Sequence, residues 1–210
     1  MRTTILAALA ALAAGCFGGL KNEAPAPLIY RVNPPALTAG APLAADLLVV
    51  VEGTAPGLDG TGIAGRWPGN RLDYLAGARW AEDVPTLVQA ALIEALQATG
   101  RPRSVQGKLG RFRATHTLVI EVRRFDADYT GGGMPVAQVA LAATLGRSSD
   151  RRVLASFTVA ASEAAAENRQ TSVVAALDAA FAKAAGELAE KTFAAIAAEP
   201  AAQASANIAP

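Results

Sequence analysis

The sequence contains a single cysteine and a single histidine among its 210 residues. One cysteine excludes an internal disulfide and a cysteine-based zinc cluster, and one histidine excludes a multi-histidine metal centre. The 19 basic and 18 acidic residues nearly cancel. No block of Lys and Arg supplies the basic face that binding to nucleic-acid phosphates requires. We therefore expect no metal or other cofactor, and no nucleic-acid partner.

Charged residues are also scarce, at 18% of the chain, and aromatic residues make up only 5%. Hydrophobic residues reach 52%, of which alanine is the largest part, with 51 residues. This composition is unlike that of a fully disordered chain, which combines low hydrophobicity with high charge. The length suits one ordinary domain with a modest core.

The N-terminal sequence lacks an apolar run long enough to cross a membrane. Residues 5–14 are apolar without interruption, and Gly15 and Cys16 follow directly. A helix needs about 20 apolar residues to span a bilayer, so the pattern predicts an export signal. It resembles a bacterial lipoprotein signal, in which residues 1–15 are removed and Cys16 is acylated. The alternatives are an ordinary secretory signal that ends near Cys16, and a buried cysteine that packs as a small apolar side chain.

The segment that follows, residues 16–27, contains Gly, Pro and polar residues without periodicity, which predicts a flexible tether. Two or more acyl chains on Cys16 anchor a protein stably to a membrane. In lipoproteins that this signal resembles, Asp after the cysteine favours the inner membrane, whereas this chain has Phe17. We therefore expect the periplasmic face of the outer membrane in a Gram-negative envelope.

Beyond the tether, blocks that favour strands alternate with blocks that favour helices. Alternating or continuous apolar patterns predict strands over 28–32, 45–52, 71–75, 115–125, 135–145 and 152–161. Glycines and prolines predict loops over residues 53–70. The last three strands are separated by short turns, which favours an antiparallel meander.

Two helices are predicted. Asp83 caps the first, which continues to about Thr99, with Val84, Val88, Leu92 and Leu96 on one stripe. Gly100-Arg101-Pro102 ends it, and the second helix covers 170–197. The fold class is therefore α+β, with a mixed or antiparallel sheet of about four to six strands and two helices packed on one face. We expect one such domain over 28–198 and a disordered tail over 199–210.

Three patterns could carry chemistry, and each favours a structural interpretation. Residues 60–65 match the dinucleotide motif G-x-G-x-x-G, but Trp67-Pro68 follows where a helix should begin. His116 could serve as a general base, yet no G-x-S-x-G elbow accompanies it, so a structural or solvated strand histidine is favoured. Asp126 and Asp128 could form an acid–base pair or hold calcium, but no calcium-binding loop follows, which favours solvated turn acids. We expect no enzymatic activity.

The most distinctive stretch contains Tyr74 in a strand and Arg79-Trp80-Ala81-Glu82 at a helix entrance. Together with the lipoprotein signal and Leu28-Ile29-Tyr30-Arg31-Val32, it resembles the ABC-type transport auxiliary lipoprotein family, the PqiC-like proteins. The glycine content of the loop before Arg66, and Trp67-Pro68, depart from the usual pattern of that family. Trp80 either fills the junction between sheet and helix as a buried plug or anchors a partner protein, and we favour the plug. The same two interpretations, structural or partner-binding, apply to Tyr74 and Arg79.

The resemblance implies a non-catalytic outer-membrane lipoprotein subunit of a transport system that moves lipids between the inner and outer membranes. The implied partners are the membrane, through the acyl groups on Cys16, and an MCE-type substrate-binding protein with its permease and ATPase. Lipid binding by the domain itself and a homo-oligomeric state stay open. The alternative is another envelope-assembly lipoprotein, such as an activator of a cell-wall synthase or a lipopolysaccharide-export component.

Overall fold

The computed structural model describes residues 25–108 and 113–199. The predicted signal peptide, Cys16, most of the predicted tether and the predicted tail beyond Glu199 lie outside the described residues. Within the described part, neither helix combines the length and the apolar character needed to span a bilayer.

The long strand β6 (His116–Asp128) organises the sheet. Along one edge it pairs antiparallel with β7 (Val136–Arg147), which pairs antiparallel with β8 (Val153–Ala164). Along its other edge it pairs in parallel with two strands in succession, first with β2 (Leu43–Thr54) and then, at its C-terminal end, with β3 (Gly62–Trp67). The predicted meander of the last three strands is thus confirmed.

The remaining strands extend the sheet from β2 and β3. Strand β5 (Pro102–Gln106) pairs in parallel with β2, strand β4 (Arg71–Trp80) pairs antiparallel with β3, and β1 (Leu28–Tyr30) pairs in parallel with β4. The sheet is therefore mixed, as expected, but the prediction of four to six strands is wrong because the described residues form eight.

The two strands that the sequence analysis did not predict are β3 and β5. Strand β3 lies inside residues 53–70, which were expected to form loops because of their glycines and prolines. Strand β5 begins at Pro102, which was interpreted only as part of the signal that ends the preceding helix. Proline is tolerated at the first residue of a strand, since no ladder hydrogen bond to its nitrogen is required there.

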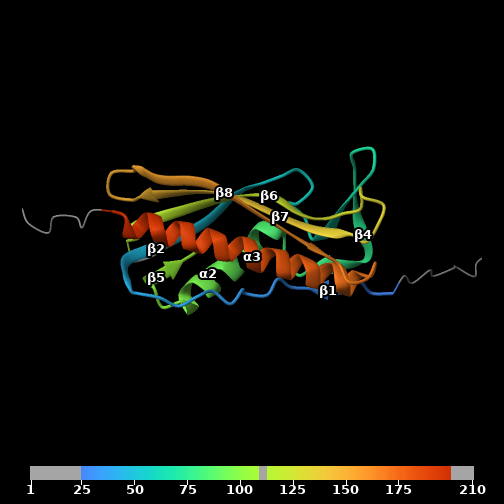
Figure 1. The fold of residues 1–210 in the computed structure, drawn as a ribbon, viewed down its shortest axis with the longest axis horizontal. Coiled ribbons are helices and arrows are strands. Elements are labelled where there is room, and N and C mark those ends of the chain that lie inside the picture. Colours follow the sequence, from blue (N-terminus) through green and yellow to red (C-terminus); the bar gives the residue numbers. More distant parts are fainter. Residues whose placement is uncertain (1–24, 109–112, 200–210) are drawn as a thin grey trace, which may run out of the picture.

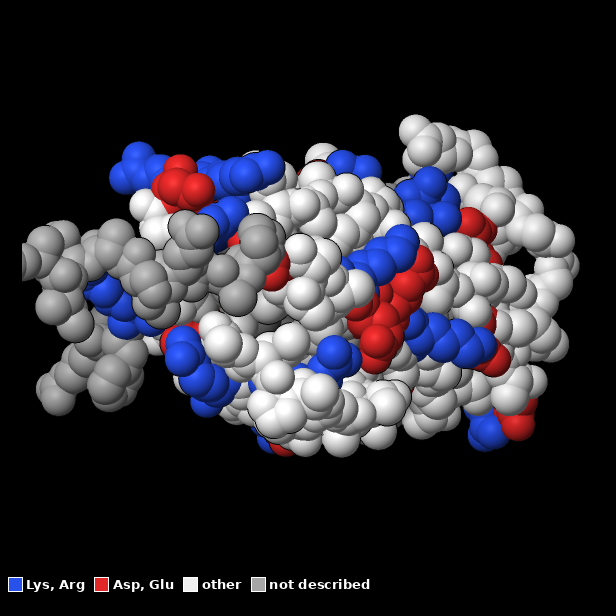
Figure 2. Space-filling model, turned by 60° about the vertical axis from the view of Figure 1, so that its left-hand side comes forward, with Lys and Arg blue, Asp and Glu red and all other residues white. Residues whose placement is uncertain are grey.

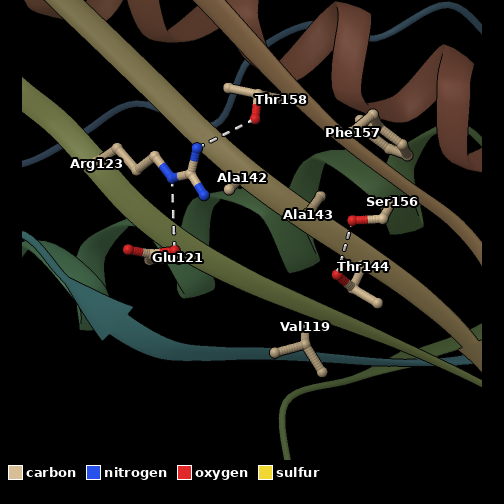
Figure 3. A pocket seen from close by; sticks show the side chains of 9 residues that line it. All are labelled: Val119, Glu121, Arg123, Ala142, Ala143, Thr144, Ser156, Phe157 and Thr158. Carbon is tan, nitrogen blue, oxygen red and sulfur yellow. Dashed lines mark hydrogen bonds and ion pairs between the residues drawn. The ribbon is translucent and has the colours of Figure 1, made fainter.

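The helices follow their predicted bounds closely. Helix α2 (Val84–Ala98) is capped by Asp83, whose Oδ1 accepts a hydrogen bond of 2.8 Å from the Thr86 N–H. The predicted stripe is buried throughout, and α3 (Gln170–Ala197) has the predicted bounds. Helix α2 packs on β2 and β5, and α3 packs on β7 and β8. Both helices lie behind the strands in Figure 3, so they cover the same face of the sheet.

The core lies between the helices and the sheet and is built around aromatic side chains. The rings of Trp80 and Phe125 meet edge to face at 5.7 Å, and those of Phe125 and Phe181 at 6.1 Å. These three side chains come from β4, β6 and α3, and all are fully buried. Edge-to-face pairs of this kind stabilise a core beyond their buried area.

The molecule is elongated, with different elements at its two ends (Figure 1). Strand β1 and the beginning of α3 lie at one end, where the Gln170 amide donates a hydrogen bond to the Ala76 carbonyl of β4. The C-terminal end of α3, the beginning of β2 and the turn between β7 and β8 lie at the other end. Because α3 has 28 residues, it runs for about 42 Å along this axis.

Candidate functional site

The structure separates the three β4 residues that the sequence singled out. Trp80 faces the core and is fully buried, and its Nε1 has no hydrogen-bond partner among the described residues. Arg79, on the opposite side of the strand, is exposed. Tyr74 is 45% exposed and donates a hydrogen bond of 3.1 Å from its hydroxyl to the Gly57 carbonyl. Trp80 therefore packs as a plug, and the three side chains do not form one site.

The glycines of residues 60–65 have a packing role. A Cβ added to Gly62 would lie 2.3 Å from the Tyr74 ring, and one added to Gly65 would lie 2.4 Å from the Trp67 ring. The motif runs into strand β3, and no helix follows it. It therefore lacks the helix N-terminus on which the dinucleotide motif depends, as the sequence analysis expected.

The aspartates at the end of β6 correct the expectation of solvated turn acids. Asp126 is only 3% exposed, and its carboxylate accepts hydrogen bonds of 3.1 and 2.8 Å from the Arg124 guanidinium. The Arg66 Nε lies 3.8 Å from the same carboxylate. Asp126 is thus the buried centre of an ion-paired cluster that joins β6 to β3, which no local sequence pattern indicated.

Asp128 completes this cluster at its exposed side. Arg124 Nη2 also donates to Asp128 at 3.2 Å, and the Thr130 hydroxyl and N–H donate to the other carboxylate oxygen. The hydrogen bond from the Thr130 hydroxyl is the main cause that lowers the pKa of Asp128, and the pKa of Arg124 is raised mainly by its hydrogen bond with Asp126. The lowered pKa keeps Asp128 an ionised acceptor, and donors within the fold bind both carboxylates. The arrangement is that of a structural clamp.

A groove with a volume of about 1200 Å³ lies at the end of the molecule away from β1. We call it the end groove. Four segments that are distant in sequence form it: residues 42–44, 113–117, 146–151 and 196–199. Its apolar part is formed by Pro42, Leu43, Ala44, Ala114, Ile196 and Ala197, and its arginines are Arg113, Arg147 and Arg151.

His116 lies at the base of the end groove and is only 5% exposed. Its Nε2 lies 2.9 Å from Glu199 Oε2, and its Nδ1 lies 2.8 Å from the Thr115 hydroxyl. The other oxygen of Glu199 lies 3.1 Å from Arg147 Nε. His116 and Arg147 thus hold the end of α3 against β6 and β7. This arrangement gives the predicted strand histidine a structural role.

The rim of the end groove is basic. Arg113, Arg147 and Arg151 line it, and Figure 2, in which this end of the molecule is turned forward, shows basic side chains together with a few acidic ones on this part of the surface. The sequence analysis did not predict this site. The only local signal was the turn over residues 147–152, which contains three arginines beside two serines and one aspartate.

A second, smaller hollow of about 340 Å³ lies on the face of the sheet that the helices leave uncovered (Figure 3). Small and hydroxyl side chains line it, including Ala142, Thr144 and Ser156. The Arg123 guanidinium spans it, with Nε 3.5 Å from Glu121 and Nη1 3.5 Å from the Thr158 hydroxyl. Within the described residues, no three His, Cys, Asp or Glu side chains gather as a metal site.

Comparison with solved structures gives close matches to the fold. The chain is similar to protein XCC0632 from Xanthomonas campestris, with 28% sequence identity and a TM-score of 0.73, over 80% of this chain and 95% of that one. It is also similar to an uncharacterised protein of known structure, with 15% identity and a TM-score of 0.60, over 79% and 98% of the two chains. No curated protein matches the sequence significantly.

The family comparison covers most of the described structure. Residues 31–189 match the model of the ABC-type transport auxiliary lipoprotein component. The match begins directly after β1 and ends within α3, so it includes α2, most of α3 and seven of the eight strands of the described residues. The resemblance that the sequence indicated is thus confirmed, and the chain belongs to the family of ABC-type transport auxiliary lipoprotein components.

Proposed function

We propose that this protein is a non-catalytic outer-membrane lipoprotein subunit of an ABC-type, MCE-linked transport system that moves lipids between the inner and outer membranes. The family match over residues 31–189 is the observation that carries the proposal, because it associates the fold with ABC-type transport. The finer elements are the MCE-type partner, the lipid cargo and the outer-membrane location. These three elements go beyond the family match and are part of the proposal.

The proposed anchor is an acylated Cys16. Each buried CH₂ of an acyl chain contributes about 0.8 kcal/mol to membrane binding, so two or more chains anchor stably. In this proposal the membrane holds the end of the molecule where the described chain begins, beside β1. The fold then projects the end groove away from the anchored end.

Affinity purification from envelopes tests the proposed partnership. We expect a tagged chain, extracted in mild detergent, to co-purify with an MCE-type substrate-binding protein, because a docking subunit stays bound to its partner. An unrelated tagged lipoprotein of the outer membrane serves as the control and should not capture that protein. Capture of a cell-wall synthase in its place would support the alternative of another envelope-assembly lipoprotein and contradict the proposal.

Replacement of Cys16 by serine tests the anchor. Serine lacks the thiol that receives an acyl group, so the Cys16→Ser chain is expected to lose metabolic labelling by radioactive palmitate and to leave the membrane fraction. Because the residue precedes the fold, the melting temperature of the domain should stay unchanged. Function in lipid transport should be lost.

The matched control for Cys16 is Ser104→Ala, an exposed change in β5 that should leave labelling and membrane binding intact. A Cys16→Ser chain that remains labelled, or one that supports full transport, is inconsistent with an essential acyl anchor at this residue.

A further inference from the structure

The end groove carries positive charge that its own residues do not balance. Arg147 is paired with Glu199 and, at 3.7 Å, with Asp150. Arg113 and Arg151 are exposed, and within residues 25–108 and 113–199 they have no side-chain hydrogen bond or ion pair. Two guanidinium groups on the rim are therefore available to an anion. Guanidinium groups bind phosphate oxygens through charge-assisted hydrogen bonds.

The same groove offers an apolar surface beside these charges. Leu43 and Ile196 belong to the apolar part of its lining, and Pro42, Ala44 and Ala197 are exposed within it. Burial of apolar surface favours a ligand with hydrocarbon of its own. A free inorganic anion would leave this part of the groove in contact with water.

The volume of the end groove and the residues that line it restrict further the class of ligand that would fit. A volume of about 1200 Å³ exceeds the range of roughly 300–1,000 Å³ that is common for small-molecule pockets. The described lining contains no Phe, Tyr or Trp on which a nucleobase could stack. An amphiphile with one phosphate and flexible hydrocarbon fits these properties better than a nucleotide does.

We infer that the end groove binds an anionic phospholipid, with its phosphate at Arg113 and Arg151 and its hydrocarbon along Leu43 and Ile196. This inference deepens the proposed function and rests on it, since it places a lipid-binding site on the transport subunit itself. The groove lies at the end of the molecule away from β1. A lipid bound there is held apart from the membrane that would retain Cys16.

Binding of soluble short-chain lipids tests the inference. The mature chain over residues 16–210, with Cys16→Ser so that no detergent is needed, is titrated calorimetrically with dihexanoyl-phosphatidylglycerol below its micellar concentration. Dihexanoyl-phosphatidylcholine and inorganic phosphate are titrated in parallel. Since the site combines charge with apolar surface, we expect the phosphatidylglycerol to bind about tenfold or more tightly than either comparison ligand.

Two substitutions on the rim address the site directly. Arg113→Gln and Arg151→Asn remove both unbalanced charges, and asparagine tolerates the positive φ of 58° at position 151. Together they are expected to weaken phosphatidylglycerol binding by about tenfold or more. The control pair Arg79→Gln and Arg123→Gln removes the same charge from strands outside the groove and should change the affinity less than about twofold.

If the double variant does not fold, a pair of substitutions at one other position in the groove tests the same site. Ala197 is exposed in the last turn of α3, within the groove. Ala197→Glu places a carboxylate there and should weaken phosphatidylglycerol binding about fivefold more than Ala197→Gln does, because like charges repel at short range.

The outcomes separate this inference from the proposed function. Equal binding of phosphatidylcholine, or binding of inorganic phosphate as tight as that of phosphatidylglycerol, overturns it. So does an affinity that the groove variants leave unchanged. If such a result accompanies intact co-purification with an MCE-type protein, only the lipid site is wrong. Phosphatidylglycerol binding without that co-purification instead contradicts the proposed function.

Discussion

Replacement of Trp80 by alanine is expected to lower the free energy of unfolding by about 3 to 5 kcal/mol, the range measured for large aromatic residues in cores. Trp80 is fully buried, and its ring packs edge to face on Phe125, which in turn packs on Phe181. The substitution opens a cavity where β4 enters the core and removes one member of this aromatic series. Chemical denaturation followed by circular dichroism measures the loss.

The control for Trp80 is the second tryptophan of the chain. Trp67 stacks on Tyr129 at 4.7 Å, with the Arg71 guanidinium 5.3 Å from its ring, and it is partly exposed. We expect Trp67→Ala to cost about 1 to 2 kcal/mol, because it removes an aromatic pair and less burial. Equal losses at the two positions, or an unchanged stability of Trp80→Ala, would contradict the role of Trp80 in the core.

A Trp80→Phe variant separates ring volume from the polar atom. The Trp80 N–H has no acceptor among the described residues, so its removal costs no hydrogen bond within this part of the fold. The loss should therefore be smaller than for alanine, about 1 to 2 kcal/mol, and arise from the smaller ring.

Replacement of Arg124 by methionine is the second substitution with a large expected effect, about 2 to 4 kcal/mol of lost stability. The Asp126 side chain is 5% exposed and accepts two hydrogen bonds from Arg124. Without them the buried carboxylate keeps, among residues 25–108 and 113–199, only Arg66, whose Nε is 3.8 Å away. The partial exposure of Arg124, at 28%, places the expected loss below that of a fully buried pair. Thermal and urea unfolding at neutral pH measure it.

The adjacent residue supplies a matched control. Arg123 pairs with Glu121 at 3.5 Å, with both side chains 52% exposed. Exposed ion pairs contribute about 0 to 1 kcal/mol, so Arg123→Met should change stability by no more than that. If Arg123→Met lowers the stability as much as Arg124→Met does, the ion-paired cluster around Asp126 does not contribute more to stability than an exposed ion pair.

The elements that sequence predicts well here are those with local signals. The bounds of α2 follow from the Asp83 cap and a four-residue apolar repeat, and those of α3 from a long alanine-rich repeat. Both signals act within one or two helical turns, so no distant residue is needed to interpret them. The same holds for the alternating pattern of β6 and β7.

The elements that were not predicted from the sequence depend on residues that are distant in the chain. Gly62 and Gly65 favoured a loop because glycine is common in loops. In the structure both lie in β3, where the rings of Tyr74 and Trp67 occupy the space that a side chain would need. Only the pairing of β3 with β4 brings the Tyr74 ring there. Asp126 likewise looked like a turn residue, because the guanidinium of Arg66 approaches it only after β3 pairs with β6.

The end groove is the clearest case of a site without a local signal. Leu43, Arg113, Arg151 and Ile196 are separated by up to about 150 positions in the chain, and each has an ordinary sequence context. Their proximity follows from the parallel pairing of β2 with β6 and from the direction of α3 across the sheet. Neither feature can be derived from residue periodicity.

The continuity of β6 makes the molecule a stiff spacer. Its 13 residues extend for about 40 Å, and the strand pairs with β7 from His116 to Asp128 with one irregularity between Val122 and Arg124, and with β2 and then β3 on its other edge. With one end joined to a bilayer through a flexible tether, such a strut would keep the two ends of the folded domain a constant distance apart. A partner bound at the opposite end would then stay separated from the tethered end by the length of the strand, while the tether sets how far the whole domain stands from the membrane.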